Sequence, residues 1–319
     1  MRRLSLPGSP PVVVAAATSR EASYVQAIES IFTTYRPPGI LAGVRVAGEA
    51  PWTRAFGQAD VARAAPMALS STFPVRSVTK SFTVTLLLQL VQSGQVALEH
   101  KIERYIAGVP NGSLINLVDL ARNQSGLADY SMQPGFLEIF VKDTLHVWTP
   151  QELVAFSFAG KPPFLPGEQY QYSNINTVLL GMVVEVVTGQ SLADALAARI
   201  FKPLGLSCTS YASSADLPPP TPTPYAVDVI TGVADDQPLI SPTSLAGSGA
   251  IASTLADLLV WAMRWFAARS SVRRFRICAS RVGETSPTAR STTATAWVSD
   301  RSATGGATPA AASDSRSRP

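Results

Sequence analysis

Residues 73–94 read FPVRSVTKSFTVTLLLQLVQSG, a segment that joins a candidate reactive pair to a long apolar run. A helix is expected to begin near Arg76 and to end at Gly94, and because it is apolar on nearly all sides it should be central and buried. Ser77 and Lys80 are three residues apart, so they share one helix face with about 5–6 Å between their Cβ atoms. The lysine amine can therefore reach the serine hydroxyl.

This pair suits nucleophilic catalysis. A serine hydroxyl is a weak nucleophile until a neighbouring base takes its proton, and a lysine is a base only where a desolvated or cationic site lowers its pKa. A buried helix start supplies such a site, and the N–H of Ser77 lies at the positive helix end, where it can stabilise an oxyanion. The alternative is that the pair has no catalytic role, so that Ser77 only caps the helix and the side chain of Lys80 is solvated. Of the five lysines, however, only Lys80 follows a serine by three residues.

A second pattern, Tyr172-Ser173-Asn174, precedes another apolar helix. A tyrosine can pass a proton between nucleophile and leaving group when an adjacent cation holds its pKa down, and an asparagine offers both a donor and an acceptor to a substrate amide. The alternative is an aromatic residue packed beside a helix N-cap.

The composition narrows the class of protein. The chain has 319 residues, 46% of them hydrophobic and 15% charged, which is typical of a globular protein with one large or two ordinary domains. Only two histidines, His100 and His146, are present, which argues against a histidine metal site and against a Ser/His/Asp triad. They are expected at the surface. Cys208 and Cys278 allow one disulfide at most.

The charge is concentrated at one end. Residues 270–319 carry eight arginines and three acids, whereas the other 269 residues carry 18 basic and 19 acidic groups, so the net charge of +4 comes from the tail. Arginines without interleaved aromatic residues carry little specificity for nucleic acid, and no nucleic-acid partner is expected.

The N-terminal segment, residues 1–22, has the basic start of an export signal, but prolines interrupt its apolar part. A periplasmic or secreted location is expected if this segment is a signal, and a cytoplasmic one otherwise. No apolar run reaches the roughly 18 to 20 residues that span a bilayer, so no transmembrane segment is expected.

Periodicity and turn residues predict the remaining elements. Helices are expected at Tyr24–Thr33, Ile175–Val187, Ser191–Ile200 and from the capping pattern Thr254–Asp257 to Ala268, strands at Ile40–Val46 and Trp52–Phe56, and short helices and loops over Ile102–Pro166.

The two patterns together resemble the serine β-lactamase and penicillin-binding superfamily, in the branch of class C β-lactamases, D-Ala-D-Ala carboxypeptidases and β-lactamase-like esterases. The resemblance covers about residues 24–266 and includes Phe73–Phe82, Gln124–Leu127, Pro166–Gly167 with Tyr170–Asn174, and Ala246–Gly249. It implies an α+β fold (an α/β sandwich), β-lactamase/transpeptidase-like, over residues 23–269. An antiparallel sheet would be flanked by helices, with an all-helical subdomain at about 95–165.

The same resemblance implies a mechanism and site residues. Ser77 would attack a carbonyl to form an acyl-enzyme, Lys80 and Tyr172 would share the proton transfers, and Asn174 would hold the substrate amide, with no cofactor and no metal. Gln124–Leu127 would form a structural turn near the cleft. The substrate would be a small molecule or a peptidoglycan peptide, and the oligomeric state is left open.

Three functions stay open at this point. The first is a serine hydrolase of the D-Ala-D-Ala carboxypeptidase or β-lactamase type, acting on a peptide, β-lactam or ester carbonyl. The second is a carboxylesterase that uses the same Ser77, Lys80 and Tyr172. The third is an inactive penicillin-binding-like protein or a pseudogene product.

The third possibility, an inactive protein, arises because the superfamily's last motif, His-Thr-Gly or Lys-Thr-Gly, is missing from the sequence. The nearest match is Ala303-Thr304-Gly305, which lacks the basic residue. Residues 292–298 can be encoded so that a second reading frame gives Tyr-Gly-Tyr-Gly-Met-Gly, and residues 306–310 so that the same frame gives Gly-His-Thr-Gly. Residues 270–319 are therefore interpreted as a basic, disordered tail produced by a frameshift between about Phe266 and Arg281, or else as a genuinely divergent tail. A frameshift would remove the C-terminal strands that pair with the N-terminal ones, leave unpaired strand edges, and weaken folding and activity.

The first prediction is that nucleotides encoding residues 266–310 contain His-Thr-Gly in a second frame. Sequencing the gene checks it, and a gene without that motif in any frame contradicts it.

Overall fold

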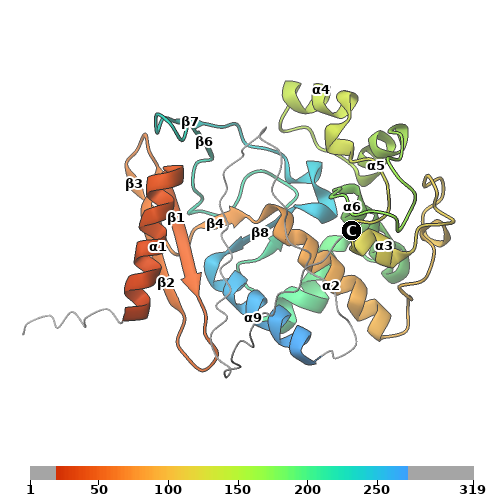
Figure 1. Ribbon diagram of the computed structural model, residues 1–319, viewed down its shortest axis with the longest axis horizontal. Helices are drawn as coiled ribbons and strands as arrows, with labels where there is room; N and C mark the ends of the chain where they lie inside the picture. The colour runs from red at the N-terminus through yellow and green to blue at the C-terminus, as the bar shows by residue number, and fades with distance from the viewer. Residues whose placement is uncertain (1–18, 272–319) are drawn as a thin grey trace, which may run out of the picture.

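The computed structural model describes residues 19–271, which form helices and antiparallel strands (Figure 1). The helices are α1 (Ser19–Tyr35), α2 (Thr79–Gln92), α3 (Leu117–Ala121), α4 (Pro134–Lys142), α5 (Pro150–Ala159), α6 (Ile175–Thr188), α7 (Leu192–Leu196), α8 (Lys202–Leu204) and α9 (Leu255–Ser271). The strands are β1 (Gly39–Val44), β2 (Trp52–Asp60), β3 (Ala65–Pro66), β4 (Thr72–Pro74), β5 (Ser210–Tyr211), β6 (Tyr225–Val227), β7 (Ala234–Asp236) and β8 (Ile251–Thr254). The expected α+β fold is confirmed. The expectations for residues 1–18 and for the tail after residue 271 lie outside the described residues.

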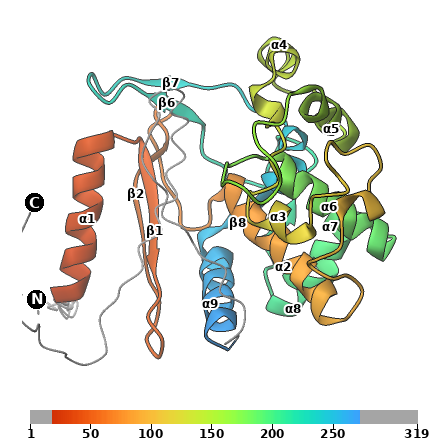
Figure 2. The ribbon, with the colours of Figure 1, turned by 45° about the vertical axis from the view of Figure 1, so that its right-hand side comes forward.

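The N-terminal layer is a sheet of order β1-β2-β3 between two helices (Figure 2). On one face α1 packs through Tyr24 against Trp52 and through Phe32 against Phe56, with ring centroids 5.2 and 6.4 Å apart. On the other face α9 lies close to β1, because a Cβ at Gly43 would already be 3.0 Å from a methyl carbon of Leu259. Within residues 19–271, β1 is an edge strand that pairs only with β2.

A second sheet, of order β4-β8-β5, connects this layer to the helices. Its pairing brings Thr72–Pro74 against Ala252–Thr254, so a strand from late in the chain holds the segment that leads to Ser77. The strands are antiparallel as expected, but those described form three small sheets, the third being β6-β7. Within residues 19–271, β1 and β2 pair with each other and with β3, and not with a strand from the C-terminal third as expected.

The predicted central helix begins later than expected. Residues 76–78 form a 3-10 turn, η1, and α2 begins at Thr79. Arg76 has a φ of 48°, in the left-handed region, so the chain leaves β4 through a tight turn before regular helical hydrogen bonds can start. The apolar run itself is helical as predicted, and Phe82, Leu86, Leu87 and Leu90 are fully buried.

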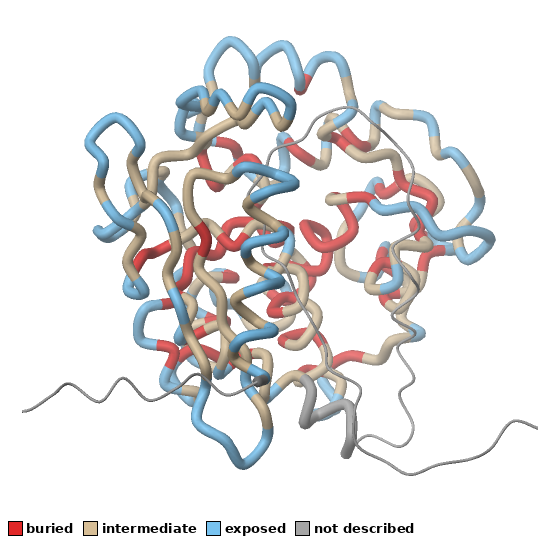
Figure 3. The backbone as a smooth tube through the Cα atoms, turned by 60° about the vertical axis from the view of Figure 1, so that its left-hand side comes forward, coloured by how far each residue is buried: buried red, intermediate tan, exposed pale blue. Residues whose placement is uncertain are grey.

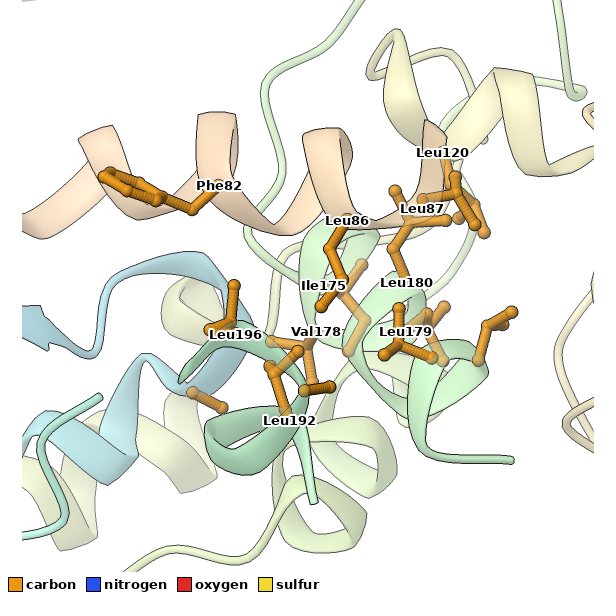
Figure 4. Close-up of a cluster of buried hydrophobic side chains, with 14 of the residues drawn as sticks. Phe82, Leu86, Leu87, Leu120, Ile175, Val178, Leu179, Leu180, Leu192 and Leu196 are labelled. Carbon is orange, nitrogen blue, oxygen red and sulfur yellow. The ribbon is translucent and has the colours of Figure 1, made fainter. Parts of the chain in front are cut away.

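The main core lies where α2 packs on α6, as Figure 4 shows. Nearly all of α6 from Ile175 to Val184 is buried, because its apolar residues cover all sides of the helix. The turn η6 (Ala246–Ser248) approaches α6 so closely that a Cβ at Gly247 would lie 2.7 Å from the carbonyl oxygen of Thr177. Glycine is required there for the turn to sit beneath α2.

A smaller aromatic cluster holds α4 and α5 together. Phe136 on α4 contacts Trp148, Phe156 on α5 and Tyr130, with ring centroids 4.6, 6.1 and 5.2 Å apart. Helix α5 starts with a capping box in which Thr149 and Glu152 satisfy each other's backbone N–H groups. Figure 3 shows buried segments in the middle of the molecule, whereas none of residues 20–35 of α1 is buried.

Within residues 19–271, no single helix has both the length and the hydropathy needed to cross a membrane. Only α6 and the helical stretch Leu192–Leu204 taken together reach that length and hydropathy, and an 83° bend separates them.

The second prediction concerns α6. Val183 is 0% exposed and Val186 is 59% exposed on the same helix. Val183→Ala should lower the free energy of unfolding by about 2 kcal/mol because it leaves a cavity in the core. The matched Val186→Ala variant should change it by less than about 0.5 kcal/mol. Urea denaturation measures both, and equal midpoints for the two variants would contradict the described burial of α6.

Candidate active site

Ser77 lies at the junction between the second sheet and the central helix. It belongs to η1, directly after the left-handed Arg76, and its side chain is exposed at the N-terminal end of α2. A left-handed non-glycine residue costs on the order of 1–3 kcal/mol and persists only where the surrounding structure holds it. Here the pairing of β4 with β8 holds the preceding residues. The serine is thus presented to solvent from a fixed backbone.

Lys80 points from the first turn of α2 to three oxygen atoms. Its Nζ lies 3.3 Å from Ser77 Oγ, 2.8 Å from Asn174 Oδ1 and 2.9 Å from the carbonyl oxygen of Ser248. The amide and backbone carbonyl oxygens can only accept hydrogen bonds, so they take two N–H groups of the lysine. A neutral amine has just two N–H groups, and its lone pair then remains for the hydroxyl proton of Ser77.

The environment favours that neutral form. Burial lowers the pKa of Lys80 from its usual 10.5 to about 7, and the charge of Asp129 acts in the opposite direction. Near pH 7 a large share of the molecules therefore carries Lys80 as an amine. This agrees with the expectation that the buried helix start would turn the lysine into a base.

Tyr172 reaches Ser77 from the segment before α6. Its hydroxyl lies 2.7 Å from Ser77 Oγ, and Lys80 Nζ lies 4.9 Å from the centre of its ring. The adjacent cation that could lower the pKa of this tyrosine is thus present in Lys80, but the pKa is not lowered. Desolvation raises the pKa of Tyr172, and the hydrogen bond with Ser77 offsets this only in part. Tyr172 is therefore a neutral phenol at physiological pH, able to donate a proton.

Asn174 completes the group of predicted residues. While its Oδ1 accepts from Lys80, its Nδ2 donates to Asp129 Oδ2 at 3.1 Å and lies 3.5 Å from Ser131 Oγ. All four predicted site residues, Ser77, Lys80, Tyr172 and Asn174, are connected through hydrogen bonds in one place.

The turn at residues 123–126 supports the segment that carries Tyr172 and Asn174. Asn123 Oδ1 accepts hydrogen bonds from Ser173 N and Asn176 Nδ2, and its carbonyl oxygen accepts from Gln171 N. Gly126 has a φ of 72°, and a Cβ there would lie 2.2 Å from a backbone oxygen of Phe164. The stretch is a structural turn beside the site, as expected from the sequence.

The histidines lie elsewhere. His100 contacts Tyr105 and Arg104, and His146 lies against Glu152 and Trp148, so neither is a partner of Ser77. Among residues 19–271, no group of three side chains has the chemistry and spacing of a metal site. The expectation of a missing third motif concerns residues that the structure does not describe.

Two residues that contact the site residues, Ser248 and Asp129, were not assigned a role from the sequence. The carbonyl oxygen of Ser248 fixes Lys80, although only the motif Ala246–Gly249 was recognised, because a backbone acceptor has no residue signature. Asp129 holds Asn174 and directly follows the recognised turn. The sequence did offer one signal for this residue. Aspartate is common at the N-cap of a helical turn, and Asp129 stands shortly after Gly126-Leu127, at the N-cap of the 3-10 turn at Tyr130–Met132.

Curated proteins similar to this chain include D-aminopeptidases. That of Brucella anthropi is 30% identical over 235 residues, which cover 73% of this chain and 44% of that protein. That of Cereibacter sphaeroides (strain KD131 / KCTC 12085) is 32% identical over 181 residues, which cover 57% of this chain and 34% of that protein. The chain thus spans less than half the length of these relatives.

Solved structures with the same fold include two amide hydrolases. A D-stereospecific amidohydrolase from Streptomyces sp. has 30% identity and a TM-score of 0.67, covering 76% of this chain and 71% of that one. A D-amino acid amidase from Ochrobactrum anthropi SV3 has 27% identity and a TM-score of 0.68, covering 79% of this chain and 71% of that one. At 23% identity, a penicillin-binding protein homologue from Pyrococcus abyssi supports the fold alone, with a TM-score of 0.66 and coverage of 79% of this chain and 57% of that one.

The family model described as Beta-lactamase matches residues 24–312, well over half of the chain. A match of that extent, on a fold shared with the structures above, confirms the resemblance, and the chain belongs to the Beta-lactamase family.

Proposed function

We propose that the chain is a serine hydrolase that cleaves an amide of a D-amino acid through an acyl-enzyme on Ser77. The observation that carries the proposal is the contact of Ser77 Oγ with two proton-transfer groups, the Tyr172 hydroxyl at 2.7 Å and Lys80 Nζ at 3.3 Å.

Acylation begins when Ser77 Oγ forms a bond to the substrate carbonyl carbon and gives its proton to the amine of Lys80. The oxyanion is stabilised by the N–H of Ser77 near the positive end of α2. The C–N bond then breaks, and the leaving nitrogen takes a proton from the Tyr172 hydroxyl, which Lys80 reprotonates. Water attacks the ester by the reverse route and releases the acid.

Asn174 binds the substrate amide in this scheme. Of the two hydrogens on Nδ2, one is held by Asp129 at 3.1 Å, whereas the contact with Ser131 at 3.5 Å is at the limit of a hydrogen bond. A substrate carbonyl oxygen can take over that second hydrogen without disturbing the first.

The substrate class is supported by the relatives. They are named as D-aminopeptidases, a D-amino acid amidase and a D-stereospecific amidohydrolase. Their common chemistry is an amide bond next to a D-configured carbon, which D-Ala-D-Ala peptides also contain. Hydrolysis of a β-lactam or an ester would use the same Ser77, Lys80 and Tyr172, so both kinds of substrate are included in the experiment below.

The third prediction is that the chain hydrolyses D-amino acid p-nitroanilides faster than their L-enantiomers, and that Ser77→Ala lowers kcat/KM by about 10³-fold or more. Ser93→Ala, at the other end of α2, should leave the rate unchanged. Release of nitroaniline measures the rate, with a penicillin and a short acyl ester run in parallel.

A fluorophosphonate probe with mass spectrometry of the labelled peptide separates the outcomes. Labelling at Ser77 with faster turnover of the ester or the penicillin would replace the amidase proposal by esterase or β-lactamase activity. A folded chain that is not labelled would contradict the enzyme proposal and favour the inactive binding protein.

The fourth prediction concerns pH. Because protonated Lys80 cannot accept the proton of Ser77, kcat/KM should rise with pH through about 7, the pKa of Lys80. Because the pKa of Tyr172 lies above 10.0, deprotonation of its phenol should cause no decline up to that pH. Lys80→Arg should abolish the activity, since a guanidinium stays protonated, whereas Lys142→Arg should match the wild type. A flat profile between pH 5 and 9 would exclude Lys80 as the base.

A further inference from the structure

Asp129 lies behind the site, where it touches none of the reacting groups directly. Its Oδ2 accepts two hydrogen bonds from Asn174, one from the backbone N and one from Nδ2, both at 3.1 Å. Its Oδ1 accepts from Ser131 N, also at 3.1 Å, and so caps the turn η3 (Tyr130–Met132). Both carboxylate oxygens therefore have partners, and one of them is committed to Asn174.

The side-chain amide of Asn174 can adopt two orientations that differ only in which end faces Lys80. In the observed one, Oδ1 accepts from Lys80 Nζ and Nδ2 donates to Asp129. In the flipped one, two nitrogen donors would face each other at Lys80, and two oxygen acceptors would face each other at Asp129. A carboxylate can only accept, so it excludes the flipped orientation.

We propose that Asp129 is a positioning residue whose carboxylate locks the Asn174 amide with Oδ1 toward Lys80 and Nδ2 toward the substrate. The expected loss of kcat/KM rests on the proposed function, whereas the fixed orientation of the Asn174 amide does not. Without the lock, Lys80 loses an oriented acceptor and the substrate loses an oriented donor.

Asp129 also acts on Lys80 through its charge. Its negative charge raises the pKa of Lys80 and so partly opposes the effect of burial. The other ionisable groups at this place are the phenols of Tyr172, before α6, and Tyr130, on η3, whose pKa values are both raised, so both stay neutral across the physiological range. The turn η6 contributes a backbone carbonyl there and no ionisable group.

The substitution Asp129→Asn separates positioning from capping. The new side chain has nearly the same shape, but one of its two ends becomes a donor. If the oxygen stays on Ser131 N, the new NH₂ faces the two donors of Asn174. If the side chain turns over, the NH₂ faces Ser131 N instead, and Asn174 loses the charge of its acceptor.

Asp143 offers a matched control. Its Oδ1 accepts from Leu145 N at 3.0 Å, an arrangement like that of Asp129 with Ser131, but it is exposed and lies outside the site. Asp143→Asn removes the same charge and weakens the same kind of turn.

The test begins with the pKa of Lys80 in the full chain, measured by NMR of lysine labelled with ¹⁵N at Nζ. Only five lysines are present, and Lys80→Arg assigns the resonance. We expect Asp129→Asn to lower the Lys80 pKa by about one pH unit and Asp143→Asn to leave it unchanged. This readout needs no turnover, so it stays informative even if Ser77 proves unreactive.

The kinetic arm uses the p-nitroanilide assay. Asp129→Asn should lower kcat/KM by about 10- to 100-fold and move the acid limb of the pH profile to lower pH, as the NMR titration does. A purely capping role would lower the melting temperature and leave kcat/KM on the plateau of the pH profile at the wild-type value, even though loss of the Asp129 charge moves the Lys80 pKa.

Asp129→Glu keeps the charge but displaces the oxygens, and it serves if Asp129→Asn does not fold. It should keep the Lys80 pKa near the wild-type value and still reduce kcat, because Asn174 is no longer held. Wild-type kcat/KM on the plateau of the pH profile in Asp129→Asn, or wild-type kcat in Asp129→Glu, would overturn the proposal.

Discussion

The candidate site depends on the desolvation of a single amine. Lys80 lies in the first turn of the central helix α2, and two carbonyl oxygens accept hydrogen bonds from its Nζ while burial lowers its pKa to about 7. An amine in water would stay protonated at that pH and could not take a proton from Ser77. The packing of α2 on α6, and of η6 beneath both, is therefore part of the chemistry. Gly247 belongs to this arrangement, since any side chain there would separate η6 from α6.

The environments of Lys80 and Tyr172 suit them to opposite steps of proton transfer. Desolvation moves the pKa of Lys80 down and that of Tyr172 up, so near neutral pH the same burial produces an amine that can accept and a phenol that can donate. No histidine takes part in this arrangement of the described residues. In the proposed mechanism, these opposite pKa shifts let two residues that are ordinarily poor proton carriers at pH 7 take the part that histidine plays in a Ser/His/Asp triad.

The sequence predicted those parts of the fold and site that depend on residue type and spacing. The apolar α2, the reactive pair three residues apart and the Tyr-Ser-Asn segment were all visible, and Ser191 caps α7 as expected. The strained turn at Arg76, the division of the strands into small sheets, the raised pKa of Tyr172 and the role of Ser248 were not. Each of these depends on the distance between segments or on the degree of burial, which a local pattern does not contain.

The contact between Lys80 and Ser248 joins residues 168 positions apart. During synthesis, the first half of the site therefore leaves the ribosome long before its last acceptor exists. Until η6 and β8 have docked, the amine of Lys80 is hydrated and Ser77 is an ordinary alcohol, because β4 has no partner strand and Nζ lacks one of its two carbonyl acceptors. Under the proposed function, the nascent chain would therefore be unreactive toward acyl donors until residues 246–254 have packed against the segment around Lys80.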